Sequence, residues 1–185
     1  MLIAREKEKN NIAEFILYMW QMEDLVRGCN MDLQTVMSKV FPDESDQAQM
    51  MEYAQWFALL IEDMQHQGVV KEGHLKNVRT YMKSVESLHH ALLTVYQDSA
   101  YISQYKKADP YIKDLRRKIN VKDLPETEVC LVGLYGYLML RIRQAEISEE
   151  TKEAMDEISL MVALLSNGFN KLKNGELHLP DSLSN

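Results

Sequence analysis

The sequence predicts an all-α protein, built as an antiparallel bundle of about six helices. Apolar residues recur every three to four positions through most of the 185 residues, the spacing that places them on one helix face. Only seven Gly and four Pro interrupt the chain, and so few breakers favour long helices. Twelve Met, a good helix former that fills irregular gaps in a core, agree with this fold. We expect a single domain over residues 1–175 and a mobile C-terminal tail over 176–185.

Two helices are expected in the first 40 residues. The first spans about 10–27, where an asparagine caps its start and Gly28 can take the left-handed conformation that ends it. The second spans about 32–40. Pro42 stops it, because proline lacks an N–H donor and its ring clashes with the preceding turn.

The next helices occupy the middle of the chain. One starts at Asp43 or Ser45, both good capping residues, and runs to about residue 67, with Gly68 ending it. A short connection leads to a long helix from 74 to at least 97, which the pattern allows to continue to 105. Pro110 then reads as the first residue of a short helix that ends near 119.

Two helices are predicted in the last third. The first begins at an Asp123 cap and runs to about 145, and its middle, 129–140, has no polar face. A helix that is apolar all round is buried all round, so we place it at the centre of the bundle. Gly133 and Gly136 weaken this helix, and close approach of a neighbouring helix is the expected reason. The second helix is capped by Ser148 and runs to about 175.

Composition narrows the class of protein. The formal net charge of −7 argues against general nucleic-acid binding. The run 129–140 is too short for a membrane span, and the chain turns charged after its first four residues, so we expect a cytoplasmic protein. Cys29 and Cys130 are far apart in the sequence and outside any metal-binding motif. We therefore predict that both are reduced, buried thiols. The basic tract 105–118 can be interpreted as an anion-binding face or as a solvated helix face. The net negative charge of the chain favours the second interpretation.

A carboxylate and a histidine three residues apart form the most specific pattern, Glu86 with His89. In helical bundles two such motifs with further carboxylates hold a pair of iron ions. The only similar spacing, Asp63 with His66, points away from the apolar stripe of its helix, so both motifs cannot face one interior. We therefore predict a buried, hydrogen-bonded His89, a solvated His66, and no metal or other cofactor.

Glu23 shares a helix face with apolar residues, where a bare carboxylate would cost several kcal/mol. Arg27, four residues later, can pair with it, and an ion pair at the edge of the core is the favoured interpretation. The alternative is a ligand-binding polar pocket inside the bundle. In that pocket Glu23, Arg27 and His89 would converge near Glu86, with Trp20 as an apolar wall.

The segment 11–27, close behind Met1-Leu-Ile-Ala, resembles the opening of an uncharacterised bacterial family of similar length that is known only as a domain of unknown function. The resemblance implies a helical fold and a bacterial source, but no activity and no site residues. We expect a non-enzymatic helical interaction module that binds a second copy or another protein and neither membrane nor nucleic acid. The alternative is a small-ligand or metal-dependent enzyme with its polar site inside the bundle.

Overall fold

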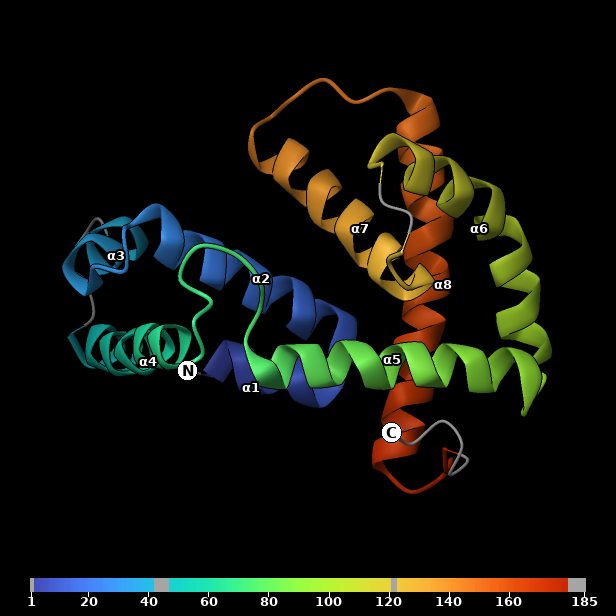
Figure 1. The fold of residues 1–185 in the computed structure, drawn as a ribbon, viewed down its shortest axis with the longest axis horizontal. Helices are drawn as coiled ribbons and strands as arrows, with labels where there is room; N and C mark the ends of the chain where they lie inside the picture. The colour runs from blue at the N-terminus through green and yellow to red at the C-terminus, as the bar shows by residue number, and fades with distance from the viewer. Residues whose placement is uncertain (1, 42–46, 121–122, 180–185) are drawn as a thin grey trace. The chain divides into compact units, whose positions relative to one another are not determined.

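The computed structural model describes residues 2–41, 47–120 and 123–179. Across these residues the chain is all-helical, as predicted, and contains no strand (Figure 1). Eight helices are described where the sequence predicted about six. They are α1 (Leu2–Asn10), α2 (Ile12–Gly28), α3 (Leu33–Val40), α4 (Gln47–His66), α5 (Lys76–Thr94), α6 (Ser99–Lys118), α7 (Glu126–Ile142) and α8 (Glu149–Lys173).

The chain divides into two compact units, of which the first comprises Met1–Lys9 and Glu14–Thr80. Within it α3 packs against α4. Asp32 caps α3, because its carboxylate accepts the backbone N–H of Thr35 at 2.8 Å. The buried face of α4 carries Phe57, Leu60, Ile61 and Met64, the stripe that its spacing predicted. The predicted stop at Pro42 and the caps Asp43 and Ser45 lie outside the described residues.

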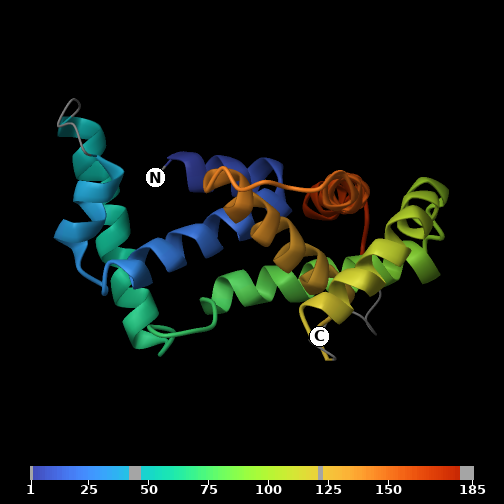
Figure 2. The ribbon, with the colours of Figure 1, turned by 90° about the horizontal axis from the view of Figure 1, so that it is seen from above.

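The second unit comprises Asn10–Ala13 and Tyr81–Asn185. Here α6 and α7 both pack against α8 and against each other (Figures 1 and 2). Ser148 caps α8, as predicted, by accepting the N–H of Thr151 at 3.2 Å. The buried face of α8 includes the predicted positions Met155, Ile158, Val162, Leu165 and Phe169. The division into two compact units does not test the predicted single domain over 1–175, which stays a prediction. In the predicted tail over 176–185, residues 180–185 lie outside the described part.

The prediction for residues 74–119 was wrong in two places. α5 ends at Thr94 and does not continue, because Gln97 takes a left-handed φ of 48° and Asp98 caps a new helix at the N–H of Tyr101. Pro110 does not start a helix but lies inside α6. It lies on the exposed side of that helix, where water can bond the carbonyl of Lys106 that lacks its amide partner. Buried side chains on the opposite side of α6 hold both halves of the helix in place.

The N-terminal helix α1 was not predicted. Its residues 5–9 are all charged, so its sequence lacks the apolar stripe that identifies a helix. Lys7 of α1 pairs with Glu14 of α2 at 2.7 Å. The expected helix over 10–27 is α2, and α1 precedes it, with Asn11 between the two helices.

Only the first half of α7 is buried. Val129, Cys130, Leu131 and Gly133 are buried, as predicted, and so is Thr127 before them. From residue 134 to 142 no side chain is buried, and Leu140 and Ile142 are 40% and 55% exposed, so the predicted burial of 129–140 on all sides is wrong for its second part. A side chain on Gly133 would collide with a terminal methyl of Leu115 in α6, which confirms the expected close approach at Gly133. At Gly136, apart from its two neighbours in the chain and the adjoining helix backbone, no described atom lies within 4 Å of the position of a Cβ, so no neighbouring helix among the described residues approaches there.

Both cysteines are buried and free, as predicted. Burial raises the pKa of the Cys130 thiol far above its usual range. None of the described helices has the length and hydropathy needed to span a membrane.

Candidate functional site

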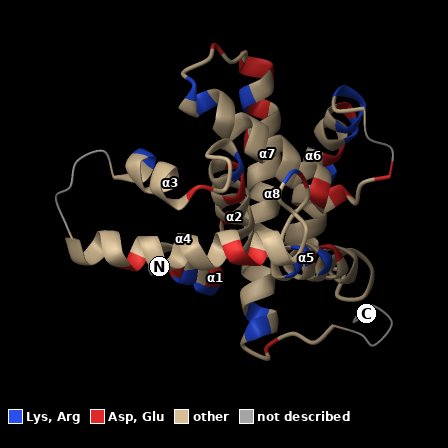
Figure 3. Cartoon of the chain, turned by 60° about the vertical axis from the view of Figure 1, so that its left-hand side comes forward, with Lys and Arg blue, Asp and Glu red and all other residues tan. Residues whose placement is uncertain are grey.

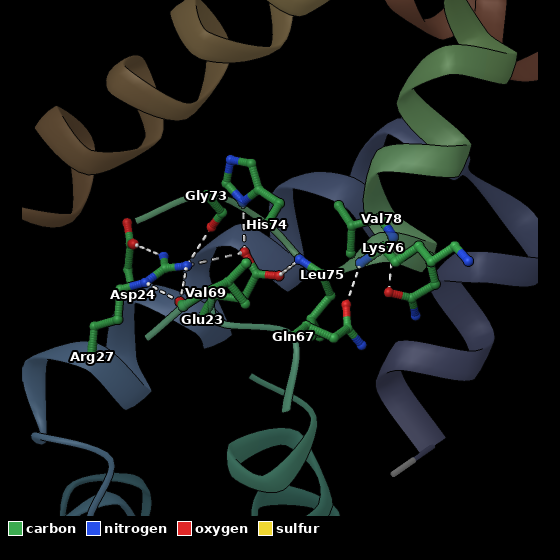
Figure 4. A network of polar contacts seen from close by, with 11 residues as sticks. Glu23, Asp24, Arg27, Gln67, Val69, Gly73, His74, Leu75, Lys76 and Val78 are labelled. Carbon is green, nitrogen blue, oxygen red and sulfur yellow. Dashed lines mark hydrogen bonds and ion pairs between the residues drawn. The ribbon is translucent and has the colours of Figure 1, made fainter. Parts of the chain in front are cut away.

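A buried carboxylate fixes the connection between α4 and α5. Glu23 of α2 is 0% exposed, and its Oε2 lies 2.6 Å from Nδ1 of His74 (Figure 4). Its Oε1 accepts the backbone N–H of Leu75 at 3.0 Å. An ionised carboxylate only accepts hydrogen bonds, so Nδ1 of His74 is the donor. These two bonds offset the several kcal/mol that burying the carboxylate costs, and they attach the loop to α2.

Arg27 belongs to the same network but is not the main partner of Glu23. Its Nη2 is 4.0 Å from Oε2 of Glu23, at the limit of an ion pair. The guanidinium donates instead to the carbonyls of Val69 and Gly73 and to the carboxylate of Asp24 (Figure 4). Arg27 therefore holds the loop 68–73 at two backbone positions.

Trp20 lies beside this network and packs against it. Its ring stacks on the imidazole of His74 with centroids 4.6 Å apart and an interplanar angle of 13°. Trp20, Glu23 and Arg27, three of the predicted site residues, therefore meet in the first unit. The residue that joins them, His74, was expected only as the start of a helix.

The other two predicted residues, Glu86 and His89, lie on α5 in the second unit. Glu86 does not pair with His89. One of its oxygens is 3.0 Å from Nε2 of His90, and the other accepts both the hydroxyl and the backbone N–H of Thr127. Thr127 is in the first turn of α7, where free N–H groups and the helix dipole favour a negative charge. Glu86 therefore stabilises the start of α7.

His89 is 1% exposed, which confirms the predicted buried histidine. Its Nδ1 lies 2.6 Å from the hydroxyl of Tyr101, and its Nε2 lies 3.5 Å from Oε2 of Glu126. The hydroxyl of Tyr105 donates to the same carboxylate at 2.8 Å. In the arrangement that satisfies these groups, Glu126 accepts from Nε2–H and Nδ1 accepts from Tyr101.

The electrostatics of this cluster fix the charge states of its carboxylate and its two phenols. The hydrogen bond to His89, followed by that to Tyr105, lowers the pKa of Glu126 to about 2, so its carboxylate is ionised at neutral pH. Burial raises the pKa of Tyr101 far above its usual range, and burial together with the bond to Glu126 does the same for Tyr105. Both phenols stay protonated as donors, and neither supplies a nucleophile.

The predicted ligand positions do not form a metal-binding set. Among the residues that the structure describes, no three or more His, Cys, Asp or Glu side chains are grouped as metal ligands. The solvated His66 is exposed, as expected. In the basic tract 105–118, Lys113 pairs with Asp109, and Arg117 and Lys118 pair with Asp114, all within α6.

A cavity of about 590 Å³ lies in the second unit, between the end of α5, the start of α6 and the last part of α8. Its size is in the range that holds small molecules. Its lining combines apolar side chains with a few polar ones, and includes Leu92, Tyr101, Leu164, Asp98, Asn167 and Lys171. The sequence did not predict it, because its walls come from segments more than 60 residues apart.

One side of α7 is an apolar surface that is partly exposed. Val132, Tyr135, Met139 and Ile142 follow spacings of three, four and three residues, so they lie on one side of the helix. Each is at least partly exposed, and Gly136 lies beside them. We name these five residues the α7 face. Figure 3 shows few charges along α7, whereas Lys, Arg, Asp and Glu gather where α7 ends and α8 begins.

Comparison with known proteins gives a family but no activity. No curated protein and no solved structure matches the chain. A family model does match, over residues 1–176, and so includes all eight described helices and both polar clusters. The chain therefore belongs to the family described as a domain of unknown function (DUF4924).

Proposed function

We propose that this chain is a non-enzymatic helical interaction module that pairs with a second copy of itself through the α7 face. One observation carries the proposal: of the nine residues 134–142, seven have apolar side chains and none is buried. They are Leu134, Tyr135, Tyr137, Leu138, Met139, Leu140 and Ile142. Removing apolar surface from water stabilises a contact by about 25 cal/mol per Å², so such a segment favours a partner.

Charge supports a second copy as the occupant. Glu128 lies four residues before the first residue of the α7 face, and Arg143 directly follows its last residue. A contact between two copies related by a two-fold axis brings the same surface together in reverse order. The acidic end of one face then meets the basic end of the other, so the surface is complementary to itself.

The mass of the protein in solution tests this proposal. We expect about 43 kDa by light scattering after size exclusion, twice the 21.5 kDa of one chain. Ile142→Glu places a charge in the contact and should yield the single-chain mass. Leu160→Glu on α8 is the matched control, because Leu160 is 56% exposed and Ile142 is 55% exposed. The control should remain paired.

Two results would overturn the proposal. One is a wild-type protein that has the single-chain mass at concentrations up to about 100 μM, where even weak biological pairs associate. The other is an Ile142→Glu variant that keeps the wild-type mass with an unchanged circular dichroism spectrum. A variant that loses its helical signal would show that the α7 face is covered within its own chain, which also contradicts the proposal.

A small-ligand protein is the second candidate function, and the cavity at the end of α5 supports it. Lys171 and Asn167 offer donors beside the apolar wall of Leu92 and Leu164, which suits a small amphipathic carboxylate. Thermal-shift measurements with carboxylates of two to ten carbons test this candidate. A rise in melting temperature that Leu164→Trp abolishes would support it, and no rise for any acid would count against it.

A further inference from the structure

The spacing of the α7 face fits one particular way of pairing two helices. Val132, Tyr135, Met139 and Ile142 recur at spacings of three and four residues, so they form an apolar strip along one side of α7 that another helix can cover. Gly136 interrupts the surface beside Tyr135, and apart from its two neighbours in the chain and the adjoining helix backbone no described atom lies within 4 Å of the place of its Cβ. A large side chain therefore stands next to an open position on the same face.

Resting on the proposed function, we infer that two α7 helices pair antiparallel about a two-fold axis between Tyr135 and Gly136. In this register Tyr135 packs over the partner's Gly136, and Val132 faces the partner's Met139. In an antiparallel pair the residue numbers of any two facing positions add up to the same total. Glu128 therefore faces the partner's Arg143. In this arrangement the large side chain of each Tyr135 packs over a glycine. Opposite charges also face each other at both ends of the pair.

The parallel arrangement satisfies none of these conditions. It places Tyr135 against the same tyrosine of the partner and leaves the two glycines facing each other across a gap. It also sets Glu128 against the same glutamate of the partner, and like charges in direct opposition are unfavourable. The α7 face is therefore complementary to itself in one direction only.

Cysteine cross-linking distinguishes the two arrangements. A tagged Val132→Cys chain and an untagged Met139→Cys chain are coexpressed and oxidised gently. In the antiparallel register these two positions face each other. The same position in two partners is about seven residues, or ~10 Å, apart along the helix axis, too far for a disulfide. We expect cross-links between the two variants and none within either one. Wild-type protein is the control, since both native cysteines are buried.

Cross-links only between identical variants would show a parallel pair and overturn this inference. So would a double-mass protein in which neither combination cross-links. In both results the proposed pairing through α7 survives, because the wild-type mass and the Ile142→Glu variant test it separately. A wild-type protein of single-chain mass would overturn both.

A charge exchange tests the register independently. Glu128→Lys and Arg143→Glu should each raise the dissociation constant of the pair about two- to fivefold, the range of a partly exposed ion pair. The double variant should return the constant to within about twofold of wild type, because the two charges still face each other. A double variant as weak as the sum of the two single changes would contradict the register.

Discussion

Oε2 of Glu23 lies 2.6 Å from Nδ1 of His74, although 51 residues separate them in the chain. The contact joins α2 to the connection between α4 and α5, and the backbone N–H of Leu75 completes it. A charge that is both buried and paired makes the loop part of the core of the first unit.

Replacing Glu23 should therefore be costly. Glu23→Gln keeps the shape and an acceptor for Leu75 but removes the charge, and we expect a loss of about 1–3 kcal/mol in the free energy of unfolding. Urea denaturation at pH 7 measures it. The control is Glu14→Gln on the same helix, where the exposed pair with Lys7 predicts a change of at most about 1 kcal/mol. Equal effects of the two changes would contradict the role given to Glu23.

The two glycines of α7 should respond to substitution in opposite directions. Gly133→Leu forces a side chain into Leu115 of α6 and should lower the free energy of unfolding by about 1–3 kcal/mol. Gly136→Ala meets open space and should raise it by up to about 1 kcal/mol, because alanine is the better helix former. Both changes are best measured in an Ile142→Glu background, which separates folding from pairing. A stabilising Gly133→Leu would show that α6 does not approach as described.

Acid should weaken the second unit through Glu126. Its pKa is lowered from 4.5 to about 2 by its bonds to His89 and Tyr105. A lowered pKa means that the stabilisation is complete above about pH 4.5 and disappears as the pH falls through 2. About a third of the side chain is exposed, so solvent screening reduces the effect to roughly 1–2 kcal/mol. The difference in stability between wild type and Glu126→Gln should shrink over this window, and a constant difference from pH 7 to 2.5 would exclude the mechanism.

The two native thiols should be unreactive in the folded protein. Cys29 and Cys130 are both buried, and burial raises the pKa of the Cys130 thiol, so little thiolate is available. A disulfide reagent at pH 8 should label neither until guanidinium unfolds the chain, whereas Leu160→Cys should be labelled within minutes. Rapid labelling of the folded wild type would show that one of these sites opens.

Helices with an apolar stripe could be predicted from the sequence, and those without one could not. The stripe of α8 and its Ser148 cap are local patterns, fixed by helix geometry, and both are confirmed. α1 has no stripe, because its second half is charged, and it was missed. The break before α6 and the passage of α6 through Pro110 depend on an Asp98 cap and on burial that only the tertiary structure supplies.

The candidate site follows the same division. That Glu23 needs a partner could be inferred from one helix, because an apolar stripe around a carboxylate implies burial. The identity of that partner, His74, could not be inferred from the sequence, because α3 and α4 separate the two residues along the chain. Arg27 was the natural prediction, since residues three or four positions apart are neighbours on the surface of a helix. Likewise, the burial of His89 could be predicted, but its bond to Tyr101 could not.

The proline within α6 has a mechanical consequence. Pro110 has no N–H, so the backbone hydrogen bond from residue 110 to the carbonyl of Lys106 is missing. Bending α6 at this point therefore breaks no hydrogen bond between these two residues. The two halves are anchored separately, the first where Gln104 donates to Glu157 of α8 and the second where Arg116 donates to the carbonyl of Leu124. α6 can thus bend at Pro110, on its exposed side, while a hydrogen bond holds each of its two halves in place.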